Sequence, residues 1–236
     1  MISPLKVFIG YDTRETAAVW TLANSILKNT RTPIQFTFLH LPSLTEAGIM
    51  WRARDPKQST DFTFSRFLVP YLCSYKAGPA IFMDCDMVLT PGSDIAELPE
   101  YLGLDSDVAV VKHNYIPKSA RKFGGAEQTQ YPLKLQSSLI VWNPNTFKCR
   151  QLTPKFINEA DPKVLHRWEW THPSRVAEIP EAWNWVPEWS GERVPVNDAK
   201  LIHFTEGSPS WKAYRDAANA DVWWQEYKEA TAVEVE

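Results

Sequence analysis

The first half of the chain alternates short apolar runs with a segment of helical period. Residues 6–10, 34–39, 80–83 and 107–111 have the length and composition of buried strands. Between the first two runs, residues 15–27 repeat apolar side chains every three or four positions, as a helix packed on one face does. This order predicts an α/β fold in which helices flank both faces of a mostly parallel sheet.

The second half is less regular, and nine of the 11 tryptophans lie in it, from residue 142 onward. The other expected elements are loops at 42–61 and 113–132, helices at 62–75 (bent at Pro70), 153–165 and 213–230, and strands at 137–142 and 199–204.

Composition excludes several classes of protein. Hydrophobic residues make up 44% and charged residues 22%, as in a soluble globular domain, and no apolar run approaches the ~20 residues of a membrane helix. A net charge of −3 without a basic block argues against a nucleic-acid-binding surface. Three cysteines without metal-type spacing, and an N-terminus without a signal region, lead us to expect a cytoplasmic protein.

Two carboxylates, Asp84 and Asp86, interrupt the apolar run at 81–89. Ligands of open α/β sheets bind beyond the carboxyl ends of the strands, where these side chains are expected to lie. Carboxylates so close repel each other unless a divalent cation lies between them, and oxygen ligands suit magnesium or manganese. The spacing alone leaves two interpretations open, a metal site and turn carboxylates that face solvent.

Three further features are candidates for the same site. His203 ends an apolar run, Arg66 precedes the carboxylate strand, and Gly10-Tyr11-Asp12 follows the first strand. An imidazole can complete a metal shell, a guanidinium can hold a diphosphate or sugar hydroxyls, and a strand-end turn can meet a nucleotide base. The alternatives are a buried histidine bonded to a carbonyl, a surface salt bridge and a plain turn.

Taken in order along the chain, these segments resemble GT-A-fold glycosyltransferases, and most closely glycosyltransferase family 8. The resemblance runs through residues 5–211, and its most specific part is the Asp-x-Asp with the Gly-x-Asp segment after it. The segments that carry it are Val7-Phe-Ile-Gly-Tyr11, Ser65-Arg66-Phe-Leu-Val-Pro70, Ile81-Phe-Met-Asp84-Cys-Asp86, Gly92-Ser-Asp94-Ile-Ala-Glu-Leu98, Ser137-Ser-Leu-Ile-Val-Trp-Asn143 and His203-Phe204.

This resemblance implies a hexosyltransferase that moves a sugar from a nucleotide-diphospho-sugar, usually a UDP-sugar, to an acceptor hydroxyl with manganese or magnesium. It implies a Rossmann-like GT-A fold in one domain over 1–236, with a nucleotide-binding half at 1–111. The other half, 112–236, is expected to bind the acceptor and to include the C-terminal helix.

The resemblance also assigns roles to residues. Asp84, Asp86 and His203 fall on the family's metal ligands. The residues expected to act in catalysis are Asp86, Gln136 and Glu169. The residues expected to bind the donor are Phe8, Ile9, Gly10, Tyr11, Asp12, Arg66, Asp84, Cys85, Ser137, Gly207 and Lys212.

Several departures indicate a divergent branch. The family's asparagine in the segment that lines the donor sugar is Gln136 here, and its glycine is Ser138. The family's diphosphate-binding lysine is missing between His203 and Trp211, and Lys212 is the candidate substitute. The family's Asp-Gln-Asp segment has no clear copy, which leaves Glu169 as the candidate there.

The expected mechanism passes through an oxocarbenium-like transition state while the nucleoside diphosphate leaves, and a metal neutralises the growing charge. Retention, which the family implies, needs no protein nucleophile because the leaving phosphate guides the acceptor hydroxyl. Inversion would need a carboxylate base, for which Glu169 and Glu188 are the candidates.

Two segments keep alternative interpretations. The tryptophans at 168, 170, 183, 185 and 189 either line an acceptor groove or fill a core, and we expect core for most of them. The basic loop with Lys118, Arg121 and Lys122 is either a lid over the diphosphate or a solvated loop.

The alternative function is a non-catalytic glycan-binding module with a structural metal. A nucleotidyltransferase is disfavoured because the segment from Gly10 to Glu15 does not resemble the glycine-rich loop of those enzymes. The sequence leaves the acceptor and the oligomeric state open.

Overall fold

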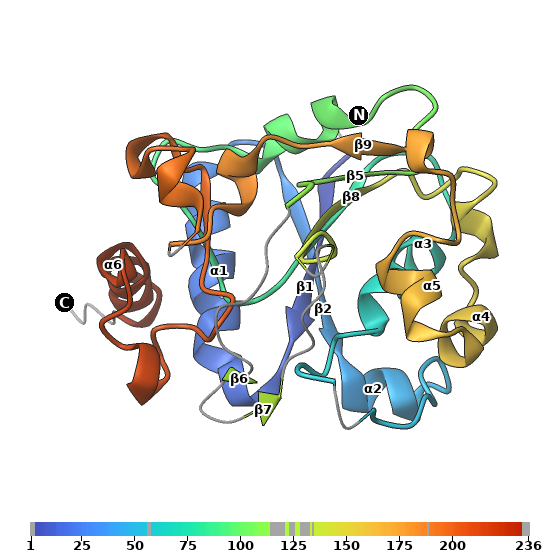
Figure 1. Cartoon of the computed structure of the whole chain (residues 1–236), viewed down its shortest axis with the longest axis horizontal. Coiled ribbons are helices and arrows are strands. Elements are labelled where there is room, and N and C mark those ends of the chain that lie inside the picture. Colours follow the sequence, from blue (N-terminus) through green and yellow to red (C-terminus); the bar gives the residue numbers. More distant parts are fainter. Residues whose placement is uncertain are drawn as a thin grey trace.

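A computed structural model describes residues 3–55, 58–113, 121–122, 126–127, 133, 135–187 and 189–232. At its centre is a six-stranded sheet with the strand order β2-β1-β3-β8-β5-β9 (Figure 1). All strands of this sheet run in one direction except β8, which is antiparallel to both of its neighbours. The strands are β1 (Leu5–Tyr11), β2 (Ile34–His40), β3 (Ala80–Met83), β5 (Val108–Val110), β8 (Leu139–Trp142) and β9 (Val176–Glu178).

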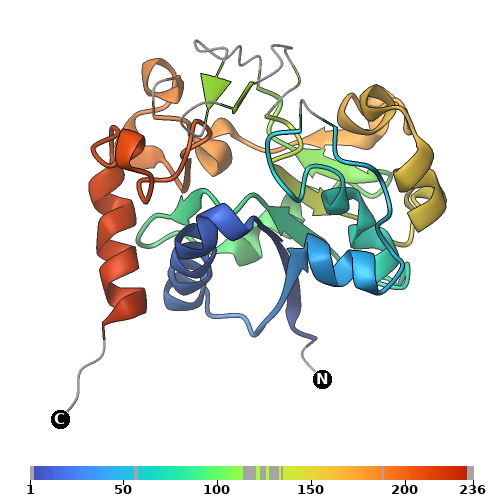
Figure 2. The same cartoon turned by 90° about the horizontal axis from the view of Figure 1, so that it is seen from below.

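Helices cover both faces of the sheet, which confirms the expected layers. On one side lies α1 (Thr16–Asn29), and α6 (Ala220–Thr231) packs against its outer surface (Figure 1). The short helices of the other side are α2 (Leu41–Glu46), α3 (Val69–Leu72), α4 (Pro154–Glu159) and α5 (Pro162–His166), and Figure 2 shows the same separation after a quarter turn. Strand β3 is buried along its whole length, as expected for a strand covered on both faces.

A second, two-stranded sheet brings distant parts of the chain together. Strand β4 (Met87–Leu89) pairs antiparallel with β10 (Leu201–His203), and this register sets His203 opposite Met87. The Asp-x-Asp turn therefore lies between β3 and β4, beside the end of β10. A third pair, β6 (Arg121–Lys122) with β7 (Ala126–Glu127), lies in the segment expected to be a loop.

Two helices expected as single elements are interrupted at prolines. Residues 62–75 do not form one helix; a 3-10 turn over Ser65–Leu68 is followed by α3, with Pro70 in its first turn. Residues 153–165 divide into α4 and α5, because Pro162 opens a new helix that the Asp161 side chain caps. Proline lacks the N–H that a helix interior needs and fits only the first turn.

Two further expectations were wrong in their extent. The C-terminal helix begins at Ala220 rather than at residue 213, because Asn219 has a left-handed φ of 62° that breaks the helical path. The segment 42–61, expected to be a loop, contains most of α2, in which Leu44 alone is buried. One buried residue in six is too weak a periodic signal to be seen in sequence.

The tryptophan-rich segment contributes mainly to the core. Four of its five tryptophans, Trp168, Trp170, Trp183 and Trp185, are buried, and Trp189 is half-buried. The ring of Trp170 stacks on that of Trp142 with centroids 6.0 Å apart. This burial matches the expectation that most of these tryptophans fill a core. None of the helices in the described part of the chain is long and apolar enough to cross a membrane.

Candidate active site

The turn between β3 and β4 is fixed from both sides by main-chain hydrogen bonds. The N–H of Asp84 donates to the carbonyl of Ser138 at 2.9 Å, and the carbonyl of Asp86 accepts from the N–H of Phe204 at 2.9 Å. Cys85, between the two acids, is buried, and its thiol lies 3.8 Å from Oε2 of Glu15. The turn therefore joins the start of β8 to the end of β10.

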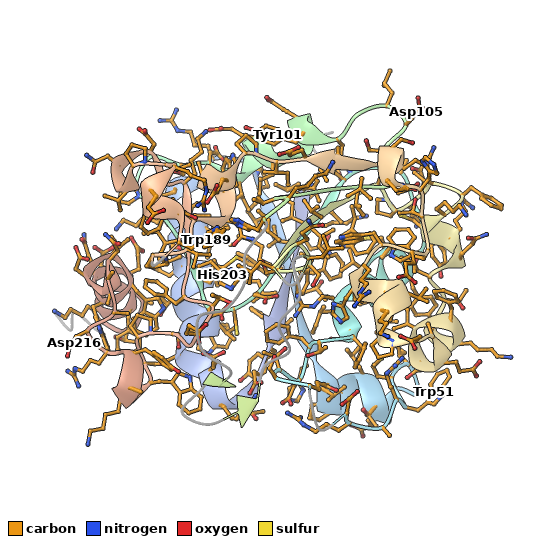
Figure 3. All side chains as sticks on the ribbon, in the orientation of Figure 1. Trp51, Tyr101, Asp105, Trp189, His203 and Asp216 are labelled. Carbon is orange, nitrogen blue, oxygen red and sulfur yellow. The ribbon has the colours of Figure 1, made fainter. Side chains whose placement is uncertain are left out.

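Asp84, Asp86 and His203 converge on one point. Each offers a ligand atom, and these atoms all lie within 4.8 Å of one another. The side chains are 13%, 4% and 1% exposed respectively, and Figure 3 shows His203 in the interior while Asp105 and Asp216 project from the edge. Two carboxylate oxygens and one imidazole nitrogen, held close together and largely out of water, suit a divalent cation.

Arg66 lies in this group rather than in a surface salt bridge. Its Nη1 is 2.9 Å from Oδ1 of Asp84 and donates to the carbonyl of Ser137 at 2.6 Å. The guanidinium is buried beside the rings of Phe62 and Phe82, with 5.3 Å and 5.0 Å to their centroids. The arginine therefore orients the first carboxylate and packs its guanidinium against two aromatic faces.

The segment before β8 contains Gln136 and Ser137, and the carbonyl of Ser137 is the one that accepts from Arg66. Oε1 of Gln136 accepts from the indole N–H of Trp168 at 3.0 Å, and Trp168 has a left-handed φ of 61°. Oγ of Ser137 lies 3.2 Å from Nδ1 of His166. Burial, with the charges of Arg66 and Arg52 adding to it, lowers the pKa of His166 to about 3, so this ring is neutral at pH 7.

Glu15 is a residue of this region that the sequence analysis did not identify. It is 2% exposed, and its Oε1 accepts from the N–H of Ser208 at 3.3 Å and from the indole N–H of Trp211 at 3.0 Å. Burial, with repulsion from Asp86 adding to it, raises the pKa of Glu15 to about 7. A signal was present in the sequence, since an acid at 15 is in phase with the apolar face of α1.

The segment after His203 contains two predicted donor-binding residues in different settings. Gly207 is buried with a φ of 148°, a backbone conformation that favours glycine. Lys212 is exposed on the 3-10 turn over Lys212–Tyr214. Glu15 therefore holds the segment that contains Gly207, and Lys212 lies on its outer side.

The end of β1 is packed more tightly than a sequence pattern can indicate. Phe8 and Ile9 are buried, and a Cβ at Gly10 would clash with the ring of Phe62. The hydroxyl of Tyr11 lies 3.2 Å from that of Thr16. Only glycine therefore lets the loop around residue 62 approach this strand end.

The carboxylate of Asp12 is engaged by its own neighbours. It accepts from Nε and Nη2 of Arg14 at 2.9 Å and 2.6 Å, and from the main-chain N–H groups of Arg14 and Asp61. Burial alone would raise the pKa of Asp12, but the bonds from Arg14 outweigh it and lower the pKa. This predicted donor-binding residue therefore caps the turn before α1 and ties β1 to the loop at 59–61.

The remaining predicted residues lie apart from this network or outside the description. Glu169 is exposed, directly after Trp168. Glu188 and Lys118 lie outside the described residues, and so do the side chains of Arg121 and Lys122.

No known protein-family profile matches the chain. Protein CDI of Arabidopsis thaliana is 36% identical over 228 residues, which cover 96% of this chain and 87% of that protein.

Among solved structures, the bifunctional glycosyltransferase WbbM superposes with a TM-score of 0.65 at 16% identity, over 96% of this chain. The glycosyltransferase GlyE of Streptococcus pneumoniae gives 0.61 at 14% identity, over 95% of this chain. The galactosyltransferase LgtC, in complex with donor and acceptor sugar analogues, gives 0.61 at 12% identity over 98% of both chains. This chain spans 50% of the WbbM chain and 60% of the GlyE chain. These similarities confirm the GT-A fold.

Proposed function

We propose that this chain, which belongs to the same family as Protein CDI of Arabidopsis thaliana, is a metal-dependent glycosyltransferase using a nucleotide-diphospho-sugar, because it has the GT-A fold of the glycosyltransferases WbbM and LgtC. The observation that carries this proposal is the convergence of Asp84, Asp86 and His203 beyond the ends of β3 and β10. In open α/β sheets, that edge is where nucleotide ligands bind.

The metal in this proposal is manganese or magnesium, held by Asp84, Asp86 and His203. When bound, it supplies positive charge that stabilises the diphosphate leaving group. Arg66 keeps Asp84 oriented toward the same point, at 2.9 Å. The burial of Asp84, Asp86 and His203 excludes water, which strengthens the attraction of the two carboxylates for a divalent cation.

The donor in this proposal is a UDP-sugar, bound by the half of the chain over 1–111. The end of β1 supplies main-chain groups and Tyr11 for the base and ribose, while Asp12 acts through its turn because Arg14 already engages its carboxylate. The structure of LgtC with donor and acceptor analogues supports a donor site on this fold. Cytoplasmic location remains a prediction.

The sugar and the acceptor are proposed to meet at the segment before β8. Gln136 and Ser137 are held there by Trp168 and His166, at 3.0 Å and 3.2 Å. Side chains fixed in this way can orient a donor sugar with little loss of entropy. We propose transfer of a hexose with retention, to a hydroxyl acceptor bound by the half over 112–236. The exposed Glu169 is the proposed acidic group on the acceptor side, and Gly207 and Lys212 lie on the diphosphate side.

Thermal unfolding with UDP, GDP, ADP or CMP, each with manganese or with EDTA, tests this proposal. Ligand at ~100 times its dissociation constant adds roughly 2.7 kcal/mol, and each kcal/mol moves the midpoint ~2–4 °C at this size. A shift with UDP that EDTA abolishes supports a UDP-sugar donor, and a shift with GDP alone changes the donor. No nucleotide shift, together with glycan binding, would favour the non-catalytic module.

A further inference from the structure

Asn184 lies in the 3-10 turn over Glu181–Asn184, between β9 and β10, and is fully buried. We propose that Asn184 is a positioning residue for the metal site, which fixes the ring of His203 so that Nε2 faces the carboxylates. This inference rests on the metal-dependent function proposed above. It concerns a residue to which the sequence assigned no role.

The hydrogen bond between the two side chains determines which nitrogen of the ring carries the proton. Oδ1 of Asn184 lies 2.8 Å from Nδ1 of His203, and an amide oxygen can only accept. Nδ1 therefore carries the hydrogen, and in the neutral ring Nε2 keeps its lone pair. Nε2 is the nitrogen that lies 3.2 Å from Asp86, so the lone pair is directed at the metal position.

The orientation of the Asn184 amide is itself fixed. Its Nδ2 donates to Oγ of Ser138 at 2.8 Å and lies 3.5 Å from the carbonyl of Leu135. The Ser138 hydroxyl donates its hydrogen to the carbonyl of Leu135 at 2.6 Å, so Oγ can only accept from Asn184. A flipped amide would set an oxygen against a carbonyl, so Oδ1 must point toward His203.

The same serine connects two of the metal ligands. Its main-chain carbonyl accepts from the N–H of Asp84 at 2.9 Å, while its hydroxyl accepts from Asn184. Asn184 and Ser138 therefore fix the first carboxylate and the imidazole relative to each other. The resemblance expects glycine at 138, and the serine found there supplies the hydroxyl that this network uses.

The main chain around Asn184 is held without help from its side chain. Its carbonyl accepts from Nε2 of His113 at 2.7 Å, the N–H of Trp185 donates to Leu201, and the N–H of His203 donates to the carbonyl of Trp185. Substitution of the Asn184 side chain should therefore leave the 3-10 turn in place and free only the ring of His203 to rotate.

The test is manganese binding by the purified chain without nucleotide, followed through the electron paramagnetic resonance signal of the free ion. Asn184→Ala is expected to lower manganese affinity about 10- to 100-fold, the usual effect of removing a partner of a metal ligand. Asn184→Asp is expected to restore most of the affinity, because a carboxylate also accepts from Nδ1–H.

Asn158→Ala is the matched control. Asn158 is also a buried asparagine, but its side chain bonds to main-chain groups of residues 49, 51, 52 and 154. Its loss is expected to lower the thermal midpoint in EDTA and to leave manganese affinity unchanged. If the role of Asn184 were purely structural, Asn184→Ala would also lower the thermal midpoint and leave manganese affinity unchanged.

Native affinity in folded Asn184→Ala would overturn the proposal. If that variant does not fold, Ser138→Ala removes the group that orients the amide and is expected to lower manganese affinity by a smaller factor; unchanged affinity there would equally overturn it. Absence of manganese binding by the unsubstituted chain would instead contradict the metal site, and the positioning role with it.

Discussion

Two strand ends of the same sheet edge carry buried carboxylates and use them differently. Beyond β1, Asp12 has its counter-charge built in, because Arg14 and two main-chain N–H groups engage both of its oxygens. Beyond β3, Arg66 pairs with Asp84, yet the ligand atoms of Asp84, Asp86 and His203 all lie within 4.8 Å of one another, and the buried Glu15 lies close to Asp86. A carboxylate at a strand end is therefore a candidate ligand only when its neighbours leave it turned toward a shared point.

Asp86→Asn should produce the largest effect. Removal of one of two anionic ligands is expected to abolish metal-dependent nucleotide binding and sugar transfer, with the fold retained. Asp105→Asn, at an exposed acid, is the matched control and should change neither. Isothermal titration with manganese and UDP measures both variants, and native binding by Asp86→Asn would refute the assignment of the metal site.

Arg66→Ala, beside the end of β3, should lower the free energy of unfolding more than Arg14→Ala, beside the end of β1. The Arg66 guanidinium and its partner Asp84 are both largely buried. Loss of the guanidinium leaves the Asp84 carboxylate without its ion pair with Arg66 and is expected to lower the free energy of unfolding by about 3–5 kcal/mol. Arg14→Ala removes a side chain that is 39% exposed, and water can replace part of what it gives Asp12.

Urea unfolding in EDTA compares these two variants. Manganese should then stabilise Arg66→Ala more than Arg14→Ala, because the cation lies beside the carboxylate of Asp84 that has lost Arg66. Equal losses in the two arginine variants would contradict the difference drawn between the strand ends.

Glu15 makes the stability of the folded chain depend on pH. Its pKa is about 7 in the folded chain against an ordinary value of 4.5, so the folded state holds the proton more tightly. Stability in EDTA is therefore expected to fall as pH rises from about 4.5 to 7, by on the order of 3 kcal/mol. Glu15→Gln should remove this fall, which denaturant midpoints across that range would measure; an unchanged slope in the variant would assign the dependence to other groups.

Asp12→Ala should have the smallest effect on the metal group. Loss of the cap and of its bonds to Arg14 is expected to cost about 1–2 kcal/mol of stability. Manganese affinity without nucleotide should stay at the native value, because Asp12 is satisfied within its own turn. A large loss of manganese affinity in this variant would show that the two strand ends act as one site.

The convergence of Asp84, Asp86 and His203 could be predicted from sequence in part, because the two acids follow the apolar run of β3 and the histidine ends that of β10. The antiparallel pairing of β4 with β10, which brings the three side chains together, required the structure. Arg66 was predicted for the site, but its ion pair with Asp84 could be seen only in the structure. The role of Asn184 could not be predicted, because the tryptophan-rich segment around it has no period and its partners lie 19 and 46 residues away.

The errors in the fold have a common physical origin. Pro70 and Pro162 interrupt segments whose apolar spacing is helical, and the left-handed Asn219 delays the start of α6. Apolar periodicity reports which face is buried and does not report where a hydrogen-bonded turn fails.

An anomalous difference map from crystals grown with manganese and UDP tests the central claim most directly. We expect one strong peak between Asp84, Asp86 and His203, about 2.1 Å from each ligand atom. The diphosphate should lie on the side of the ion that faces solvent. A map with UDP bound and no manganese at these three residues would contradict the account.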